Sequence, residues 1–221
     1  MTLPIRTFHP RRGRIGTGAA DALARLWDQQ GFTIDGRAFD RDGLFGRRAP
    51  LVLEIGSGMG DATLSMAAAD PDRDYLAVDV HTPGLGALLA GAEAAGLTNI
   101  RAARGDALEL LADHLGSGEL DAIHLFFPDP WPKARHHKRR IISPERVALM
   151  RDRLRVGGTL HAATDWADYA ADMVDVLGAD PHLRGGPTAR PAWRPMTKYE
   201  RRGIQAGRTI HDLIYIRTAA T

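Results

Sequence analysis

Short apolar segments alternate with helix-like segments along most of the chain, and this alternation limits the possible folds more than any other feature. The apolar segments span residues 51–55, 75–80, 100–104, 122–127 and 159–164. Such alternation predicts a mostly parallel sheet with helices on both faces. Because no helix follows the β-branched segment 209–217, we expect a final antiparallel pair at the sheet edge, which gives seven strands in an α/β domain.

The first twenty residues differ in character from the rest. They contain several arginines and no acidic residue, since the first acid is Asp21. Like charges without a hydrophobic pattern are typical of a flexible arm. We therefore predict a basic N-terminal arm over residues 1–20 and a single domain over residues 21–221. A short helix near 19–29 and an irregular segment over 31–49 lead into the alternating pattern.

The composition excludes several classes of protein. The chain has no cysteine, which rules out disulfides, thiolate zinc sites and cysteine nucleophiles. No apolar run reaches the roughly 18 residues of a membrane helix, and no signal-peptide core follows the N-terminal arginines. With 29 basic and 27 acidic residues the net charge is only +2, so the placement of charges says more about partners than their sum. We expect a soluble cytoplasmic protein with no membrane partner.

A glycine-rich turn follows the first strand. Residues 54–60 read Glu-Ile-Gly-Ser-Gly-Met-Gly, and glycines such as Gly56 and Gly58 let a ligand approach the backbone where the next helix begins. Their spacing differs from the G-x-G-x-x-G pattern of dinucleotide-binding proteins. Glu54 would repel a pyrophosphate but suits a cationic ligand. S-adenosylmethionine, which carries an ammonium and a sulfonium group, fits this description.

Two further acids follow the next two strands. Asp79 ends its strand where a carboxylate can accept hydrogen bonds from ribose hydroxyls, and Asp106 stands where it can accept one from an adenine amino group. Either acid alone is more simply a helix cap or a surface residue. Together with Glu54 they place three acids at the carboxyl ends of successive strands, the edge at which open α/β sheets bind ligands. This arrangement predicts a Rossmann-like class I methyltransferase fold.

The segment after the fourth strand is a rigid loop. Three prolines surround Asp129 and Trp131, so that a carboxylate and an indole are presented at the same edge. Trp131 either stacks on a nucleic-acid base or caps the sheet as a core residue.

A cationic run follows this loop directly. Five of the eight residues from Lys133 to Arg140 are Lys or Arg, which favours contact with RNA phosphates over an ordinary solvated surface. His136 and His137 more simply face RNA than bind a metal, because no third ligand is spaced near them. We predict no metal site.

Together these motifs resemble those of the tRNA (guanine-N7)-methyltransferase family. The matching motifs run in order along the chain: residues 54–60, Asp-Val-His at 79–81, Pro-Asp-Pro-Trp at 128–131 with the basic run to 140, Thr-Asp-Trp at 164–166, and Thr-Lys-Tyr-Glu-Arg at 197–201. The loop over 128–140 is the most specific of them, whereas the glycine turn is shared by methyltransferases in general.

The resemblance implies a role for each matching residue. It implies that S-adenosylmethionine is bound by Glu54, Asp79, Asp106 and Asp129, together with Gly56 and Gly58 of the turn. It also implies that Asp129 lies at the reaction site as the catalytic residue. It assigns the substrate guanosine to Lys133, Asp165, Thr197, Lys198, Tyr199 and Glu200, and the RNA to Arg135, His136, His137, Lys138, Arg139 and Arg140. The implied reaction is methylation of N7 of guanine 46 in the variable loop of tRNA. We expect the enzyme to be a monomer or a weak homodimer.

Three other functions stay open at this stage. Amine methylases carry an Asp or Asn, prolines and an aromatic residue at the end of the same strand, so a base amine or a protein side chain is an alternative target. An RNA-binding protein without catalysis, whose glycine turn is structural, is the second. A nicotinamide oxidoreductase is the third, and the glycine spacing and Glu54 disfavour it.

Overall fold

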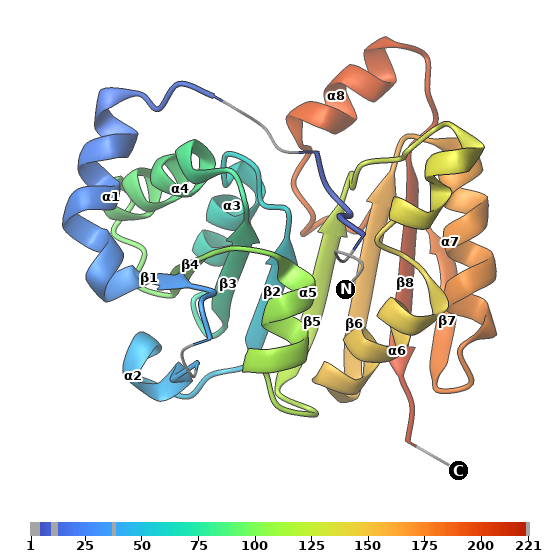
Figure 1. Cartoon of the computed structure of the whole chain (residues 1–221), viewed down its shortest axis with the longest axis horizontal. Coiled ribbons are helices and arrows are strands. Elements are labelled where there is room, and N and C mark those ends of the chain that lie inside the picture. Colours follow the sequence, from blue (N-terminus) through green and yellow to red (C-terminus); the bar gives the residue numbers. More distant parts are fainter. Residues whose placement is uncertain (1–4, 10–12, 37–38, 220–221) are drawn as a thin grey trace.

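The computed structural model describes residues 5–9, 13–36 and 39–219, and its centre is one twisted sheet (Figure 1). The sheet has eight strands in the order β1-β4-β3-β2-β5-β6-β8-β7. All pairs are parallel except those of β8 with β6 and β7. The strands are β1 Gly31–Thr33, β2 Leu51–Ile55, β3 Asp74–Asp79, β4 Ile100–Arg104, β5 Leu120–Phe126, β6 Leu154–Thr164, β7 Leu183–Thr188 and β8 His211–Arg217.

Helices cover both faces of this sheet (Figure 1). The α-helices are α1 Thr17–Gln30, α2 Arg41–Phe45, α3 Asp61–Ala69, α4 Thr82–Ala94, α5 Ala107–Glu109, α6 Pro144–Arg153, α7 Ala167–Ala179 and α8 Lys198–Gln205. A π-helical turn, η1 Leu110–His114, continues α5, and a 3-10 helix, η2 Ala134–Arg139, follows the proline loop. In the described ranges, none of these helices combines the length and the apolar character needed to cross a bilayer.

The central strands are apolar throughout because both of their faces are buried. Leu51 and Leu53 of β2 pack in one hydrophobic cluster with residues of α6 and α7, whereas Val52 packs in the other with residues of α3 and α4. A parallel strand between two helical layers needs apolar side chains in both directions. Glu54 is the exception in β2, because it is an acid with only 4% of its surface exposed. It lies near the carboxyl end of the strand, the edge at which open α/β sheets bind ligands.

The predicted fold class is confirmed, with one more strand than expected. The extra strand is β1, which pairs with β4 inside the segment over 31–49 that we had predicted to be irregular. The same segment also contains α2, which Asp40 caps by accepting from the amide of Gly43 and which ends at Gly46 in the left-handed region. Both elements are too short to give a periodic pattern. Helix α6 begins with Ser143 as its N-cap and Pro144 as its first helical residue, a position that suits the fixed φ of proline.

The strand order reverses between β2 and β5, which lie side by side. One strand leads to helices on one face of the sheet and the other to helices on the opposite face. Their carboxyl ends are therefore left uncovered by their own connections, and ligands of open α/β sheets bind at such a switch point. The glycine turn follows β2 and the proline loop follows β5, so both predicted motifs meet here.

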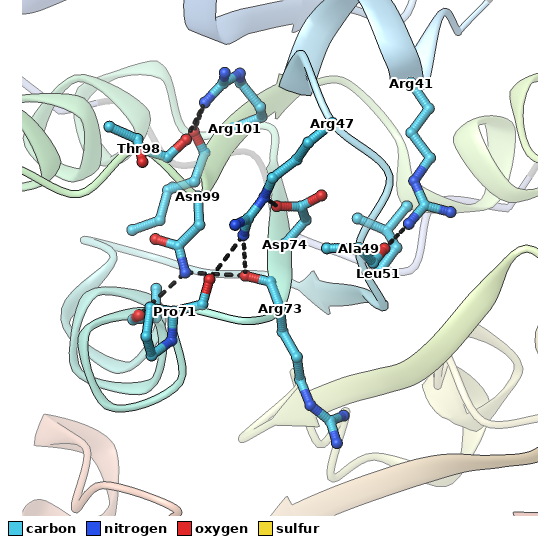
Figure 2. A network of polar contacts seen from close by, with 12 residues as sticks. Arg41, Arg47, Ala49, Leu51, Pro71, Arg73, Asp74, Thr98, Asn99 and Arg101 are labelled. Atoms are coloured by element: carbon cyan, nitrogen blue, oxygen red, sulfur yellow. Dashed lines mark hydrogen bonds and ion pairs between the residues drawn. The ribbon is translucent and has the colours of Figure 1, made fainter.

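A separate polar network closes the opposite, amino-terminal edge of the sheet (Figure 2). Arg47 Nε donates to Oδ1 of Asp74, the first residue of β3, at 2.7 Å, and Asp74 is fully buried. The Arg47 Nη2 atom also donates to the carbonyl oxygens of Pro71 and Arg73. These contacts bind strand starts to loops and lie at the edge away from the predicted motifs.

Candidate active site

The glycine turn after β2 has a backbone that only glycine adopts readily. Gly56, Gly58 and Gly60 have φ angles of 78°, 60° and 84°, in the left-handed region where a Cβ is strained. Asp79, at the end of β3, holds the turn through Oδ2, which accepts from the amide of Gly58 at 2.7 Å, while its Oδ1 accepts from the amide of His81 at 2.8 Å. The neighbouring strand ends are thereby fixed to one another.

Glu54 lies beneath this turn as a buried carboxyl group. Burial raises its pKa to about 7; the hydrogen bond from the Thr63 hydroxyl lowers it, and the nearby Asp79 raises it further. A carboxyl group with this pKa is close to half ionised at neutral pH. A cationic group placed beside it would favour the ionised form, so the site is suited to bind positive charge.

The proline loop after β5 has an unusual backbone on both sides of Asp129. Phe127 and Trp131 have φ angles of 54° and 45°, and they are the non-glycine residues of the described chain that have positive φ. Bulky residues adopt this region only when their surroundings impose it. The amide of Phe127 donates to the carbonyl oxygen of Ala163 in β6 at 2.7 Å, and Arg140 Nε donates to the carbonyl oxygen of Pro130 at 3.0 Å. The loop is therefore held in place at each end.

A cavity lies between the glycine turn and the proline loop. Its lining includes Gly56, Gly58, Asp79, Asp129 and Tyr199. A smaller adjoining pocket is lined by Glu54, Gly56, Ser57, Thr197, Lys198 and Tyr199. The structure thus brings most of the residues that the sequence assigned to the cofactor and the guanosine to two hollows at one edge of the sheet, which share Gly56, Phe126 and Tyr199.

Two predicted ligands are engaged by protein groups. Asp106 is the N-cap of α5, where its Oδ1 accepts from the amide of Leu108 at 2.9 Å, although its neighbours Gly105 and Ala107 line the cavity. Asp165 accepts a hydrogen bond from Arg208 Nε at 2.7 Å. The N-cap of α7 is Trp166, so Asp165 lies just before the helix.

The motif Thr-Lys-Tyr-Glu at 197–200 forms the start of a helix, α8, which the sequence did not predict. Thr197 is the N-cap, and its Oγ1 accepts from the amide of Glu200 at 3.1 Å. Tyr199 faces the cavity, whereas Glu200 is only 3% exposed and its carboxylate points away from solvent. The motif therefore supplies its first three residues to the pocket walls and its fourth to the interior.

Most of the basic run forms the 3-10 helix η2. Its side chains are exposed or partly exposed, except for that of Arg140, which is buried. Lys133, Arg135 and Lys138 are exposed, and Arg139 lies with its guanidinium carbon 4.9 Å from the centre of the Trp131 ring. His136 and His137 are partly exposed.

Arg140 differs from our expectation of an RNA-facing residue. It is 2% exposed, its guanidinium binds the carboxylates of Asp168 and Asp172, and its guanidinium carbon lies 4.7 Å from the Tyr169 ring centre. Its role in the structure is to join the proline loop to α7. No group of three His, Asp or Glu residues in the described chain is placed to hold a metal ion.

The segment over 5–9 is a part of the site that sequence analysis missed. Thr7, Phe8 and His9 line the cavity. The amide of His9 donates to Asp129 Oδ2 at 2.9 Å, and Trp131 Nε1 donates to the carbonyl oxygen of Thr7 at 3.1 Å. The rings of His9 and Trp131 lie with their centroids 3.9 Å apart and their planes tilted by 31°. Backbone contacts of this kind leave no pattern in a sequence. Our prediction of a flexible arm over 1–20 also extends to residues 1–4 and 10–12, which lie outside the described residues, and α1 already begins at Thr17.

Comparisons with known proteins show the family to which this chain belongs. A family model with the description "Putative methyltransferase" matches residues 48–213. The tRNA (guanine-N(7)-)-methyltransferase of Halorhodospira halophila is 54% identical over 216 residues, which cover 95% of this chain and 94% of that protein. The protein of the same name from Streptomyces avermitilis is 53% identical over 218 residues, which cover 96% of this chain and 75% of that protein.

Solved structures share the architecture at much lower identity. The crystal structure of the 16S rRNA methyltransferase KamB superposes with a TM-score of 0.59 at 18% identity, over 83% of this chain and 96% of that chain. At this identity the likeness shows the class I methyltransferase fold and nothing finer.

Proposed function

Since this chain belongs to the tRNA (guanine-N7)-methyltransferase family, we propose that it transfers a methyl group from S-adenosylmethionine to N7 of guanine 46, in the variable loop of tRNA. The observation that carries the proposal is the joint presence, at one switch point, of an acidic glycine-turn pocket and the Asp129 loop with its cationic continuation.

The pocket residues fit the chemistry of the cofactor. Glu54 is a buried carboxyl group with a pKa near 7, which a neighbouring cation would ionise. The left-handed glycines leave the backbone open on the cavity side, since a Cβ at Gly56 or Gly58 would meet no atom within 4 Å. We assign the amino-acid part of S-adenosylmethionine to Glu54 and the turn, the ribose to Asp79, and the adenine to the neighbourhood of Asp106. When bound, the cofactor supplies an electrophilic methyl group on a positively charged sulfur.

The reaction requires placement more than acid–base chemistry. Guanine N7 has a lone pair and no proton to lose, so no general base is needed. The new N–C bond forms as the S–C bond breaks, and positive charge moves onto the guanine ring. Aligning the reacting atoms accounts for several kcal/mol of the barrier, and the Asp129 carboxylate beside the base stabilises the charge that develops on it.

The same carboxylate gives a basis for choosing guanine. Its N1–H and exocyclic amine can donate to Asp129, whereas adenine presents an acceptor at N1. Trp131 is only 3% exposed, and its Nε1 donates to the carbonyl oxygen of Thr7, so we assign it the core role, in which it supports the Asp129 loop. The exposed Lys133, Arg135 and Lys138 continue from this position and suit the phosphates of the surrounding loop.

Nucleoside analysis tests the proposal. The full chain is incubated with unmodified tRNA and methyl-labelled S-adenosylmethionine, the RNA is digested, and the nucleosides are separated. We expect label only in 7-methylguanosine, and none when guanine 46 is replaced by adenine. Label in an N-methylated base amine would instead favour an amine methylase, and 7-methylguanosine formed in the substituted tRNA would contradict the assignment of position 46.

A further inference from the structure

A buried ion cluster lies directly behind the pocket, and Arg194 is its centre. The Arg194 side chain is fully buried. Its Nε and Nη2 atoms donate to Oδ1 and Oδ2 of Asp212 at 2.7 and 2.9 Å, and Nη1 donates to Glu200 Oε2 at 2.7 Å. His161 Nε2 lies 2.7 Å from the same Asp212 Oδ1. Nothing in the function proposed above uses Arg194.

The cluster depends on the shape of the guanidinium as well as on its charge. One planar fork binds both oxygens of Asp212 and still reaches Glu200, which a single ammonium group cannot do. Both carboxylates are about as buried as the arginine. Without Arg194 they would be left in the interior without this cation, a change that is costly unless one of them moves to solvent or takes up a proton.

Glu200 connects the cluster to the pocket, because it lies in the first turn of α8. Its backbone is anchored by the Thr197 cap and its carboxylate by Arg194. These two contacts fix the rotation of the turn that carries Lys198 and Tyr199 to the pocket walls. Asp212, by contrast, is held in β8, which pairs with β6 and β7 on either side.

Arg194 also contacts the opposite wall of the pocket. Its guanidinium carbon lies 5.6 Å from the ring centre of Phe126 and 5.9 Å from that of Phe127. Phe127 is the left-handed residue from which the chain continues to Pro128 and Asp129. One side chain therefore contacts both α8 and the end of the strand that delivers Asp129.

We propose that Arg194 is a positioning residue for methyl transfer: by holding Glu200 against Asp212 it sets the first turn of α8 against the cofactor pocket and in register with the Asp129 loop. This role rests on the proposed function. It differs from a purely structural role, because the loss of Arg194 should change catalysis by molecules that remain folded.

The test compares Arg194→Lys and Asp212→Asn in the full chain. Calorimetry with S-adenosylhomocysteine gives both the affinity and the fraction of competent molecules, and turnover on tRNA is then expressed per competent molecule. We expect kcat to fall by about 100-fold in each variant, the effect associated with a displacement of about 1 Å. The affinity for S-adenosylhomocysteine should fall as well, with KM for tRNA close to that of the wild type, since the exposed basic residues of η2 are untouched.

Arg47→Lys is the matched control. It breaks a guanidinium contact with the buried Asp74 at the opposite edge of the sheet (Figure 2). It should lower the melting temperature and leave kcat per competent molecule unchanged.

Two results would overturn the inference. One is wild-type kcat and wild-type affinity for S-adenosylhomocysteine in folded Arg194→Lys or Asp212→Asn. The other is the absence of folded protein in both variants while Arg47→Lys folds, because the cluster would then serve the fold as a whole. Failure of the proposed function is a separate result, since wild-type protein would then form no 7-methylguanosine.

Discussion

Burial gives the individual acids of this site different chemical properties, although their side chains are alike. Glu54 is enclosed by the sheet and α3, whereas Asp129 lies in the lining of the open cavity. For Glu54 the pKa is raised from 4.5 to about 7, mainly by burial. The folded chain therefore binds this proton more tightly than the unfolded chain does. The resulting contribution to stability is fully present below pH 4.5 and is lost as the pH rises to about 7.

Glu54→Gln should remove this pH dependence. We expect the free energy of unfolding of the variant, minus that of the wild type, to increase by roughly 3 kcal/mol between pH 4.5 and pH 8, since each pKa unit corresponds to 1.36 kcal/mol. Urea denaturation of both proteins across this range measures the difference. Burial lowers the pKa of His124 to about 3. Its effect on the free energy of unfolding is the same in the variant and the wild type, so it cancels in the difference. A difference that is constant with pH would contradict the raised pKa of Glu54.

Asp129→Asn keeps the size of the side chain and removes its charge. Because the carboxylate is proposed to stabilise charge on the methylated base, we expect kcat to fall by about 10²–10³-fold, with tRNA affinity nearly unchanged. Single-turnover kinetics and filter binding measure the two quantities. Asp175→Asn, at an exposed position of α7, is the control and should retain wild-type turnover. Full turnover by Asp129→Asn would exclude the proposed role of this carboxylate.

At the scale of elements, η2 separates residues that are adjacent in sequence. Lys133, just before η2, and Arg135 and Lys138 within it are exposed. Arg140, just after it, is buried against α7. A charge run read from sequence does not distinguish these positions, because a helical turn decides which side chains face inward.

Substitutions should distinguish the two groups. Arg135→Ala with Lys138→Ala is expected to weaken tRNA binding and to reduce the slope of log affinity against log salt by about 1.4–1.8, as phosphate contacts do. Arg140→Ala should leave that slope unchanged and lower stability by roughly 1–3 kcal/mol, through loss of hydrogen bonds to charged groups. Fluorescence titrations at several salt concentrations and thermal melts measure these effects. An equal loss of salt slope in both variants would show that Arg140 faces RNA after all.

The N-terminal segment over 5–9 occupies positions that the proposed guanine would need. His9 donates a backbone N–H to Asp129 Oδ2, and its ring lies against that of Trp131. The first of these contacts is of the kind that we assign to the base, so we expect this segment to move when tRNA is bound.

His9→Pro removes both contacts, since proline has no N–H and no aromatic ring. We expect KM for tRNA to fall by about tenfold or more, because a hydrogen bond to a charged group, here lost from the unbound state, is worth roughly 1.5–3 kcal/mol. His9→Ala, which keeps the N–H, should have a smaller effect. Steady-state kinetics with both variants measures this, and a raised KM in His9→Pro would mean that the segment assists binding.

At the scale of the whole molecule, the sequence patterns that proved reliable are those set by local chemistry. The two-sided burial of β2, β3 and β5 requires apolar runs, and Gly56 and Gly58 are needed for a left-handed turn. Such requirements act within a few residues, so they are visible in the sequence. The alternation of strands and helices then fixed the class of sheet and placed the acids at one edge.

The remaining features depend on contacts between distant segments. The pairing of β1 with β4 and the approach of His9 to Asp129 each join residues far apart in the chain. Arg140 and Arg194 look like surface arginines in the sequence, yet both are buried against carboxylates supplied by other elements.

By itself, then, the sequence determined the parallel α/β sheet, the glycine turn and the strand ends that carry Glu54, Asp79 and Asp129, because backbone sterics and alternating burial are encoded locally. Only the tertiary structure decided which charges face solvent and which are paired inside. A guanidinium becomes an interior residue when partners from other strands and helices replace its water, and the linear order of residues does not reveal those partners.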